Sequence, residues 1–268
     1  MLTSATSGIP VLSDQDGPAV EIINPTARSG LVIVCEHAAD FIPESLGGLG
    51  LSTAARSSHV AWDPGARDVA LALSGALDAV LVAARVSRLV YDCNRPPHAQ
   101  GAMPEKSEVF DIPGNRALTE EQSRARVREV YDVFSSKLAA VIQGKLAGNA
   151  PVAMVTIHSF TPVFFGKQRN VEIGVLFDAD DRLARLVLEK GRRLSMCTLH
   201  ENQPYGPQDG VTHTLVRHGL GNGIPNVMIE IRNDLIATRE GVKSVAEFLA
   251  RTLATALESL GDPQEADD

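Results

Sequence analysis

Histidines follow two of the most apolar runs in this sequence. Leu31 to Cys35 continues into Glu36-His37, and a β-branched run after Pro151 carries His158 near its end. In an open α/β sheet, ligands bind in the crevice outside the carboxyl ends of the strands. Neutral imidazole is a good zinc ligand, so the two histidines predict a metal site at one edge of a sheet.

A carboxylate is expected at the same edge. Glu230 stands in the apolar run 226–231, where burying a charged side chain is costly unless it is paired or functional. In the functional interpretation, Glu230 is the general base for a water activated by the metal. A structural ion pair with Arg232, two residues further on, is the competing interpretation.

The third metal ligand has two candidates in the sequence. Asp40 lies three residues after His37, and Asp63 lies in the segment His59 to Ala66. Asp63 precedes Pro64, a residue favoured at the first position of a helix, so a helix N-cap is the alternative role for this aspartate. Taken alone, His37 is also compatible with an ordinary hydrogen-bonded histidine in a loop.

Substrate contacts are expected from arginine and polar side chains in the loops. Arg95 precedes a Pro-Pro turn at the end of an apolar run, and a guanidinium suits a bidentate carboxylate partner. Arg88 could assist, although pairing with Asp92 is its alternative. The loop 203–214 adds further polar groups. The predicted substrate-binding residues are Arg88, Asn94, Arg95, Tyr205, His213 and Arg232.

The three cysteines are Cys35, Cys93 and Cys197. They are odd in number and far apart, which indicates neither a disulfide framework nor a CxxC zinc site. Reduced thiols in a cytoplasmic protein are therefore expected. A nucleophilic Cys35 close to His37 is one alternative to metal chemistry, and a small core residue is the other.

The overall composition excludes some classes of protein. The chain has 268 residues, a formal net charge of −8 and 44% hydrophobic residues. This charge argues against a general nucleic-acid surface. No apolar run approaches the roughly 20 residues that span a bilayer. The polar N-terminal segment does not resemble a signal peptide. A protein with a small-molecule ligand, without nucleic-acid or membrane partners, is expected; the oligomeric state is not indicated.

Strand and helix patterns alternate along the chain. Strands are predicted at 31–35, 79–83, 87–92, 152–158, 171–177 and 225–231, with a short one at 20–23. Helices are predicted at 64–77, 116–146, 179–195 and 238–260, where apolar residues recur at spacings of three and four. The alternation predicts an α/β fold, with a mixed, mostly parallel sheet and helices on both faces.

One domain is expected. Residues 1–28 are predicted to be a flexible lead-in, 29–260 the folded domain, and 261–268 a disordered acidic tail. Loops rich in Gly, Pro and Asn are concentrated at 94–115, 159–170 and 200–224. Such long connections are usually functional or disordered.

Six segments together resemble the N-formylglutamate amidohydrolase family, itself similar to zinc carboxypeptidases. They are CEHAADFIP at 35–43, HVAWDPGA at 59–66, SRLVYDCNRP at 87–96, TIHSF at 156–160, NQPYGPQDGVTHT at 202–214 and VMIEIRNDL at 227–235. The resemblance covers about residues 30 to 257. It implies a single-domain, three-layer phosphorylase/hydrolase-like fold and a hydrolase that binds one Zn²⁺ ion and cuts an amide of an N-acyl amino acid.

The resemblance also implies roles for individual residues. His37 and His158 correspond to metal ligands, and Asp63 competes with Asp40 as the acidic ligand. Asn94 and Arg95 are similar to a pair that grips the substrate carboxylate, and Glu230 to the glutamate that activates water. The first motif departs from the Pro-His-Ser-Gly pattern of members that act on N-formylglutamate, because Glu36, Ala38 and Ala39 flank His37. The substrate of this chain could therefore differ.

The expected function is accordingly a zinc-dependent amidohydrolase acting on an N-formylglutamate-like amino acid. Two other functions remain open: a non-catalytic carboxylate-binding protein and a zinc carboxypeptidase-like peptidase.

Overall fold

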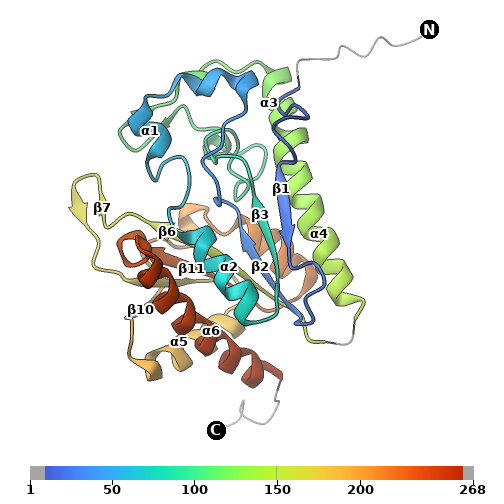
Figure 1. Cartoon of the computed structure of the whole chain (residues 1–268), viewed down its shortest axis with the longest axis vertical. Helices are drawn as coiled ribbons and strands as arrows, with labels where there is room; N and C mark the ends of the chain where they lie inside the picture. Colours follow the sequence, from blue (N-terminus) through green and yellow to red (C-terminus); the bar gives the residue numbers. More distant parts are fainter. Residues whose placement is uncertain (1–9, 149, 262–268) are drawn as a thin grey trace.

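Three of the predicted apolar runs form neighbouring parallel strands in the middle of a sheet (Figure 1). They are β2 (Leu31–Cys35), β6 (Ala153–Phe160) and β11 (Asn226–Arg232). The computed structural model describes residues 10–148 and 150–261, and within them every residue of β2 and β6 is buried. Strands covered on both faces are mostly apolar, which explains the run Leu-Val-Ile-Val-Cys of β2 and the apolar start of β6.

The sheet of the described residues has seven strands in the order β1-β3-β2-β6-β11-β9-β10. The outer strands are β1 (Val20–Ile23), β3 (Val80–Ala84), β9 (Ile173–Leu176) and β10 (Leu199–Glu201). β1 runs antiparallel to β3 and β9 antiparallel to β11, whereas all other neighbours are parallel. The prediction of a mixed, mostly parallel sheet is confirmed.

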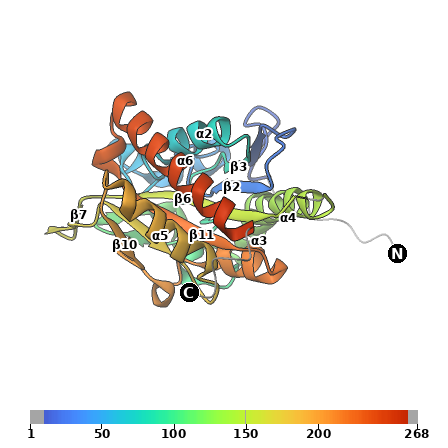
Figure 2. The same cartoon turned by 90° about the horizontal axis from the view of Figure 1, so that it is seen from below.

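Helices cover both faces of the sheet, as predicted. Their bounds are α1 (Thr53–Ser57), α2 (Ala66–Ala76), α3 (Glu120–Arg126), α4 (Asp132–Leu146), α5 (Arg182–Leu194) and α6 (Arg239–Gly261). The apolar sides of α2, α5 and α6 share one core with the sheet, while α4 shares the other. Figure 1 shows α4 beside β1, and Figure 2 shows α5 against α6, away from α4. The chain is therefore a three-layer α/β domain.

Two small hairpins lie outside the main sheet. β4 (Lys106–Ser107) pairs with β5 (Phe110–Asp111), and β7 (Val163–Phe164) pairs with β8 (Lys167–Gln168). Figure 1 shows the second hairpin projecting from the body of the domain directly after β6. Both hairpins belong to segments that the sequence marks as long loops.

The predicted strand at 87–92 is wrong. This segment forms turns, in which the backbone N–H of Val90 donates to Ser87 O at 2.9 Å and Ser87 Oγ donates to Ala61 O at 2.7 Å. Leu89, Val90 and Tyr91 are buried in the core on the α4 side. Their apolar character reflects the burial of a turn, which apolar composition alone does not separate from a strand.

The predicted helix at 116–146 is shorter at its start. It begins at Glu120, where Thr119 and Gln122 form a capping box that supplies partners for the free N–H groups. One π-helical turn, Val127–Tyr131, joins α3 to α4 without interrupting the helix.

The predicted domain boundaries stay predictions. Within the expected lead-in, residues 20–23 form β1, the short strand that the sequence indicates. The expected tail lies outside the described residues apart from Gly261, the last residue of α6. None of the described helices combines the length and apolar character that a membrane span requires.

Candidate active site

Three donor atoms form a triangle at the carboxyl ends of β2 and β6. His37 Nδ1 lies 3.2 Å from His158 Nδ1 and 3.3 Å from Asp63 Oδ2, and His158 Nδ1 lies 3.0 Å from the same oxygen. All three side chains are buried, and they are the one group among the described residues that could hold a metal ion. Tetrahedral zinc with bonds of about 2.0–2.1 Å has donor atoms roughly 3.3 Å apart. The triangle has the size of such a site.

The outer ring nitrogens of both histidines face carboxylates. His37 Nε2 lies 2.7 Å from Asp92 Oδ1, and His158 Nε2 forms an ion pair with Glu36 Oε2 at 3.1 Å. A carboxylate on the outer nitrogen keeps the proton there, so the Nδ1 lone pair is free for a cation. Because both imidazoles are arranged in this way, the residues present fit a divalent metal.

Asp63 reaches the histidines from the turn that precedes α2. Gly65, at φ 80°, is the N-cap residue, and no side chain caps the helix, so the alternative role of Asp63 as a helix N-cap is wrong. A side chain at Gly65 would lie 2.8 Å from the backbone oxygen of Ile236, which restricts this turn to glycine. The Asp63 carboxylate instead accepts from the backbone N–H of Ser159 at 3.2 Å and from Arg88 at 3.3 Å.

Charge is balanced closely around the triangle. Burial alone would lower the pKa of His158, but Glu36 and Asp63 outweigh it and hold this pKa well above its usual value. Burial also opposes ionisation of Asp63, yet the two histidines and Arg88 keep its pKa far below the ordinary range. The imidazoles of the metal-free site therefore favour the protonated form, and a bound cation would displace these protons.

Zinc affinity is expected to fall by about tenfold to a hundredfold per pH unit as the pH is lowered from 8 to 6. Coordination requires neutral imidazole, and the pKa values of both His37 and His158 are raised in the metal-free protein. Protons should thus compete with zinc at pH values where free imidazole is already neutral. Titrations of the metal-free protein against a competing chelator at pH 6, 7 and 8 measure the slope. An affinity independent of pH would contradict the role of the two imidazoles.

Glu230 lies beside His158, because these two residues are register partners on the parallel strands β11 and β6. Its side chain is buried, and Oε2 has no hydrogen-bond partner within the described residues. Burial raises the pKa of Glu230 to about 7, and the neighbouring charge of Asp63 acts in the same direction. A carboxyl group that titrates near neutral pH can both accept and return a proton. The alternative ion pair with Arg232 is not formed, since Arg232 pairs with Asp234 at 2.8 Å.

A cavity of about 210 Å³ opens above the triangle. Seven of the predicted site residues line it: His37, Asp63, Arg88, Asn94, Arg95, Tyr205 and Glu230. His158 does not line the cavity but contacts two residues that do. Arg88 also pairs with Asp92 at 2.9 Å, so the structural pairing considered from the sequence is present as well.

Other predicted residues lie elsewhere. His213 does not line the cavity and contacts Tyr131 Oη through Nε2 at 2.8 Å, and Arg232 is likewise outside the lining. Asp40 is exposed beside Thr53 and Arg56, away from the histidines. Cys35 is buried in the core shared with α2, where burial raises the pKa of its thiol well above the usual value. A buried, protonated thiol does not favour the nucleophile alternative.

Several residues of the site were not among the catalytic, metal-binding or substrate-binding residues predicted from the sequence. Glu36 and Asp92 face the outer nitrogens of the histidines, and His59 Nε2 lies 2.8 Å from Glu108 Oε2 in the cavity lining. A signal was present for Glu36, because an acidic residue directly after a fully apolar strand is costly to bury without a partner.

Comparisons with known proteins identify the family of this chain. The profile of the family described as N-formylglutamate amidohydrolase matches residues 29–237. The chain belongs to the N-formylglutamate amidohydrolase family. Membership makes it a hydrolase, and the matched region contains every residue that lines the 210 Å³ cavity.

Two solved structures are similar to this member of the amidohydrolase family. The gene product Atu2144 from Agrobacterium tumefaciens is 48% identical, with a TM-score of 0.92 over 94% of this chain and 100% of that chain. The N-formylglutamate amidohydrolase from Ralstonia eutropha JMP134 is 20% identical, with a TM-score of 0.63 over 89% of this chain and 97% of that chain. The second likeness supports the fold. No match was found among curated proteins.

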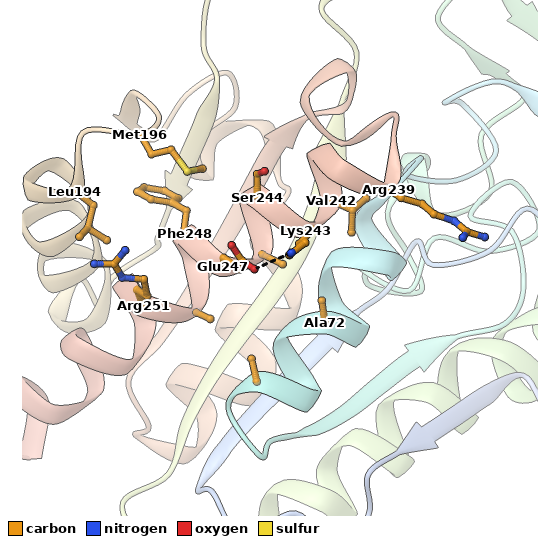
Figure 3. A pocket seen from close by; sticks show the side chains of 13 residues that line it. Ala72, Leu194, Met196, Arg239, Val242, Lys243, Ser244, Glu247, Phe248 and Arg251 are labelled. Carbon is orange, nitrogen blue, oxygen red and sulfur yellow. Dashed lines mark ion pairs between the residues drawn. The ribbon is translucent and has the colours of Figure 1, made fainter.

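A larger groove of about 780 Å³ lies between α2, α6 and the end of α5 (Figure 3). Most of its lining residues come from α6, beyond the region that matches the amidohydrolase family. Its charged side chains include Lys243 and Glu247, which pair with each other at 3.8 Å. The groove therefore lacks the converging ionisable groups of the smaller cavity, which is the better candidate for chemistry.

Proposed function

We propose that this chain is a zinc-dependent amidohydrolase that cleaves the amide bond of an N-acyl amino acid. Support comes from the triangle of His37 Nδ1, His158 Nδ1 and Asp63 Oδ2, with sides of 3.0 to 3.3 Å, and from the carboxylates behind both imidazoles. Family membership supports the amide as the bond that is cut and an amino acid derivative as the substrate.

His37, Asp63 and His158 would hold one zinc ion. When bound, zinc supplies Lewis acidity, which favours the ionisation of water near neutral pH and draws electron density from the acyl carbonyl. Asp92 and Glu36 keep the outer protons on the two imidazoles, and Arg88 fixes the carboxylates of Asp63 and Asp92. These residues hold the donor atoms in place before the substrate arrives.

Glu230 is proposed as the general base. Its carboxylate takes a proton from the attacking water while the water oxygen bonds to the acyl carbon. It then returns this proton to the amide nitrogen as the C–N bond breaks, which releases a carboxylic acid and a free amine. In the metal-free protein, burial raises the pKa of Glu230 to about 7, which is the direction that proton transfer near neutral pH requires.

Arg95 and Asn94 are proposed to orient a carboxylate of the substrate. Both residues line the cavity, and Arg95 forms no ion pair within the described part of the chain. Asn94 itself is fixed, because its Oδ1 accepts from Thr214 N at 2.9 Å and its Nδ2 donates to Val211 O at 2.5 Å. A rigid loop around Asn94 would hold Arg95 at the rim of the cavity.

The proposal predicts one zinc ion per chain, measured by elemental analysis of the purified protein. N-formyl, N-acetyl and N-succinyl amino acids are then screened for hydrolysis with and without a chelator. We expect that the chelator abolishes hydrolysis and that adding zinc restores it. Zinc content without hydrolysis would favour the carboxylate-binding alternative, and full activity in the chelated protein would contradict the metal.

A further inference from the structure

Arg169 lies beside the cavity, although the sequence did not mark it as a site residue. It follows the hairpin β7–β8, and its backbone N–H donates to Pro162 O at 2.8 Å, which closes the base of the hairpin. Two residues separate the start of the hairpin from the end of β6, the strand that carries His158. The fold thus returns Arg169 to the neighbourhood of the candidate metal site.

The guanidinium of Arg169 is held against two aromatic residues of the cavity lining. Its central carbon lies 4.3 Å from the ring centre of Phe164 and 4.8 Å from that of Tyr205, and one N–H donates to Tyr205 Oη at 2.9 Å. Stacking fixes the plane of the fork and leaves most of its five N–H donors for other partners. Glu230 is close enough to add to the effect of burial in raising the pKa of Tyr205, so this side of the cavity adjoins the proposed base.

The arginines that line the cavity already have protein partners, although those of Arg95 are backbone carbonyls and leave it without an ion pair among the described residues. Arg88 is shared by Asp63 and Asp92, and Arg95 donates to the backbone carbonyls of Asp209 and Gly210. Arg169 has no carboxylate partner among the described residues, and it is partly exposed. A fixed guanidinium without an anionic partner, set against the lining of a cavity, is suited to an anionic group of a ligand.

We propose that Arg169 binds a carboxylate of the substrate beside Phe164 and Tyr205, as a specificity-determining residue. The inference rests on the proposed amidohydrolase function. Two groups of an acidic N-acyl amino acid offer this chemistry, namely the α-carboxylate and a carboxylate on the side chain. Both present two oxygens to the guanidinium fork, and suitable probes distinguish them.

The test compares N-formyl-L-glutamate with its side-chain amide and its α-amide on wild type and Arg169→Gln. The variant should raise KM for the diacid by about tenfold to a hundredfold, with kcat nearly unchanged, because this contact is made equally in the ground and transition states. The penalty should disappear for one monoamide, which identifies the bound carboxylate. An equal penalty on all three compounds, or no penalty, would overturn the proposal.

Two further variants separate recognition from structure. Arg169→Lys should recover part of the loss, because it keeps the charge but not the fork. Arg192→Gln removes an exposed arginine of α5 and should leave all three substrates unaffected.

Calorimetric binding of the same compounds distinguishes this inference from the proposed function. If wild type hydrolyses neither these compounds nor the N-acetyl and N-succinyl amino acids of the screen, the amidohydrolase proposal fails, yet weaker binding of the diacid to Arg169→Gln would still support the carboxylate contact. Equal binding to both proteins, or no binding to wild type, would overturn it.

Discussion

Asp63→Asn is expected to release the bound zinc and to lower kcat/KM by at least about a thousandfold. The metal is expected to contribute several kcal/mol of transition-state stabilisation, and each 1.4 kcal/mol is a factor of ten in rate. The substitution keeps the size of the side chain but removes the charge that both imidazoles and Arg88 face. Elemental analysis and steady-state kinetics measure the two losses.

Asp40→Asn is the matched control. Asp40 is the rival ligand suggested by the sequence, and it is exposed beside Thr53 and Arg56. This variant should keep its zinc and retain activity within about twofold, as surface substitutions usually do. If Asp40→Asn lost the metal while Asp63→Asn kept it, the assignment of the acidic ligand would be reversed.

Glu230→Gln is expected to keep zinc and to lower kcat by about 10²- to 10⁴-fold. The amide fills the same space but cannot accept the proton of the attacking water, and general acid–base catalysis typically contributes an effect of this size. Zinc content should stay at the wild-type level, because Glu230 is not among the three donors of the triangle. An active Glu230→Gln enzyme would assign the base to another group.

The same substitution should stabilise the metal-free protein at pH 8. The pKa of Glu230 is about 7 in the folded state against 4.5 for the ordinary group, so the folded protein carries a growing penalty as the pH rises above 4.5. Glutamine has no such penalty, and the gain should approach roughly 3 kcal/mol above pH 7. Denaturant unfolding at pH 8 and pH 4 tests this: the gain should disappear at pH 4, where the carboxyl is protonated in both states.

The edge of the sheet that carries the site could be predicted because its strands are fully buried. The runs at 31–35 and 226–231 are too apolar to lie at the surface, so they were expected to be buried strands. His37 follows the first run and Glu230 lies near the end of the second, which puts both residues at the carboxyl edge of the sheet. The same reasoning wrongly predicted a strand at 87–92. A buried turn requires apolar residues as much as a buried strand does. Leu199–Glu201, which forms β10, is too short and polar to be recognised as a strand.

The partners within the site could not be predicted from local patterns. Asp63 lies 26 positions from His37. Because Pro64 follows it, the sequence offered a helix N-cap as an alternative role. The tight turn at Gly65 beside Ile236 and the hydrogen bond from the backbone N–H of Asp63 to His37 O at 2.9 Å bring this residue to the histidines. Arg169 was missed for a related reason, because its contacts with Phe164 and Tyr205 depend on how the hairpin folds back.

Crystallography of the zinc-loaded protein, with anomalous diffraction at the zinc edge, tests the central claim most directly. We expect a single anomalous peak about 2.0–2.1 Å from His37 Nδ1, His158 Nδ1 and the Asp63 carboxylate. Glu36 and Asp92 should remain on the outer nitrogens of the imidazoles. A zinc ion held elsewhere, or imidazoles that bind it through Nε2, would contradict this account.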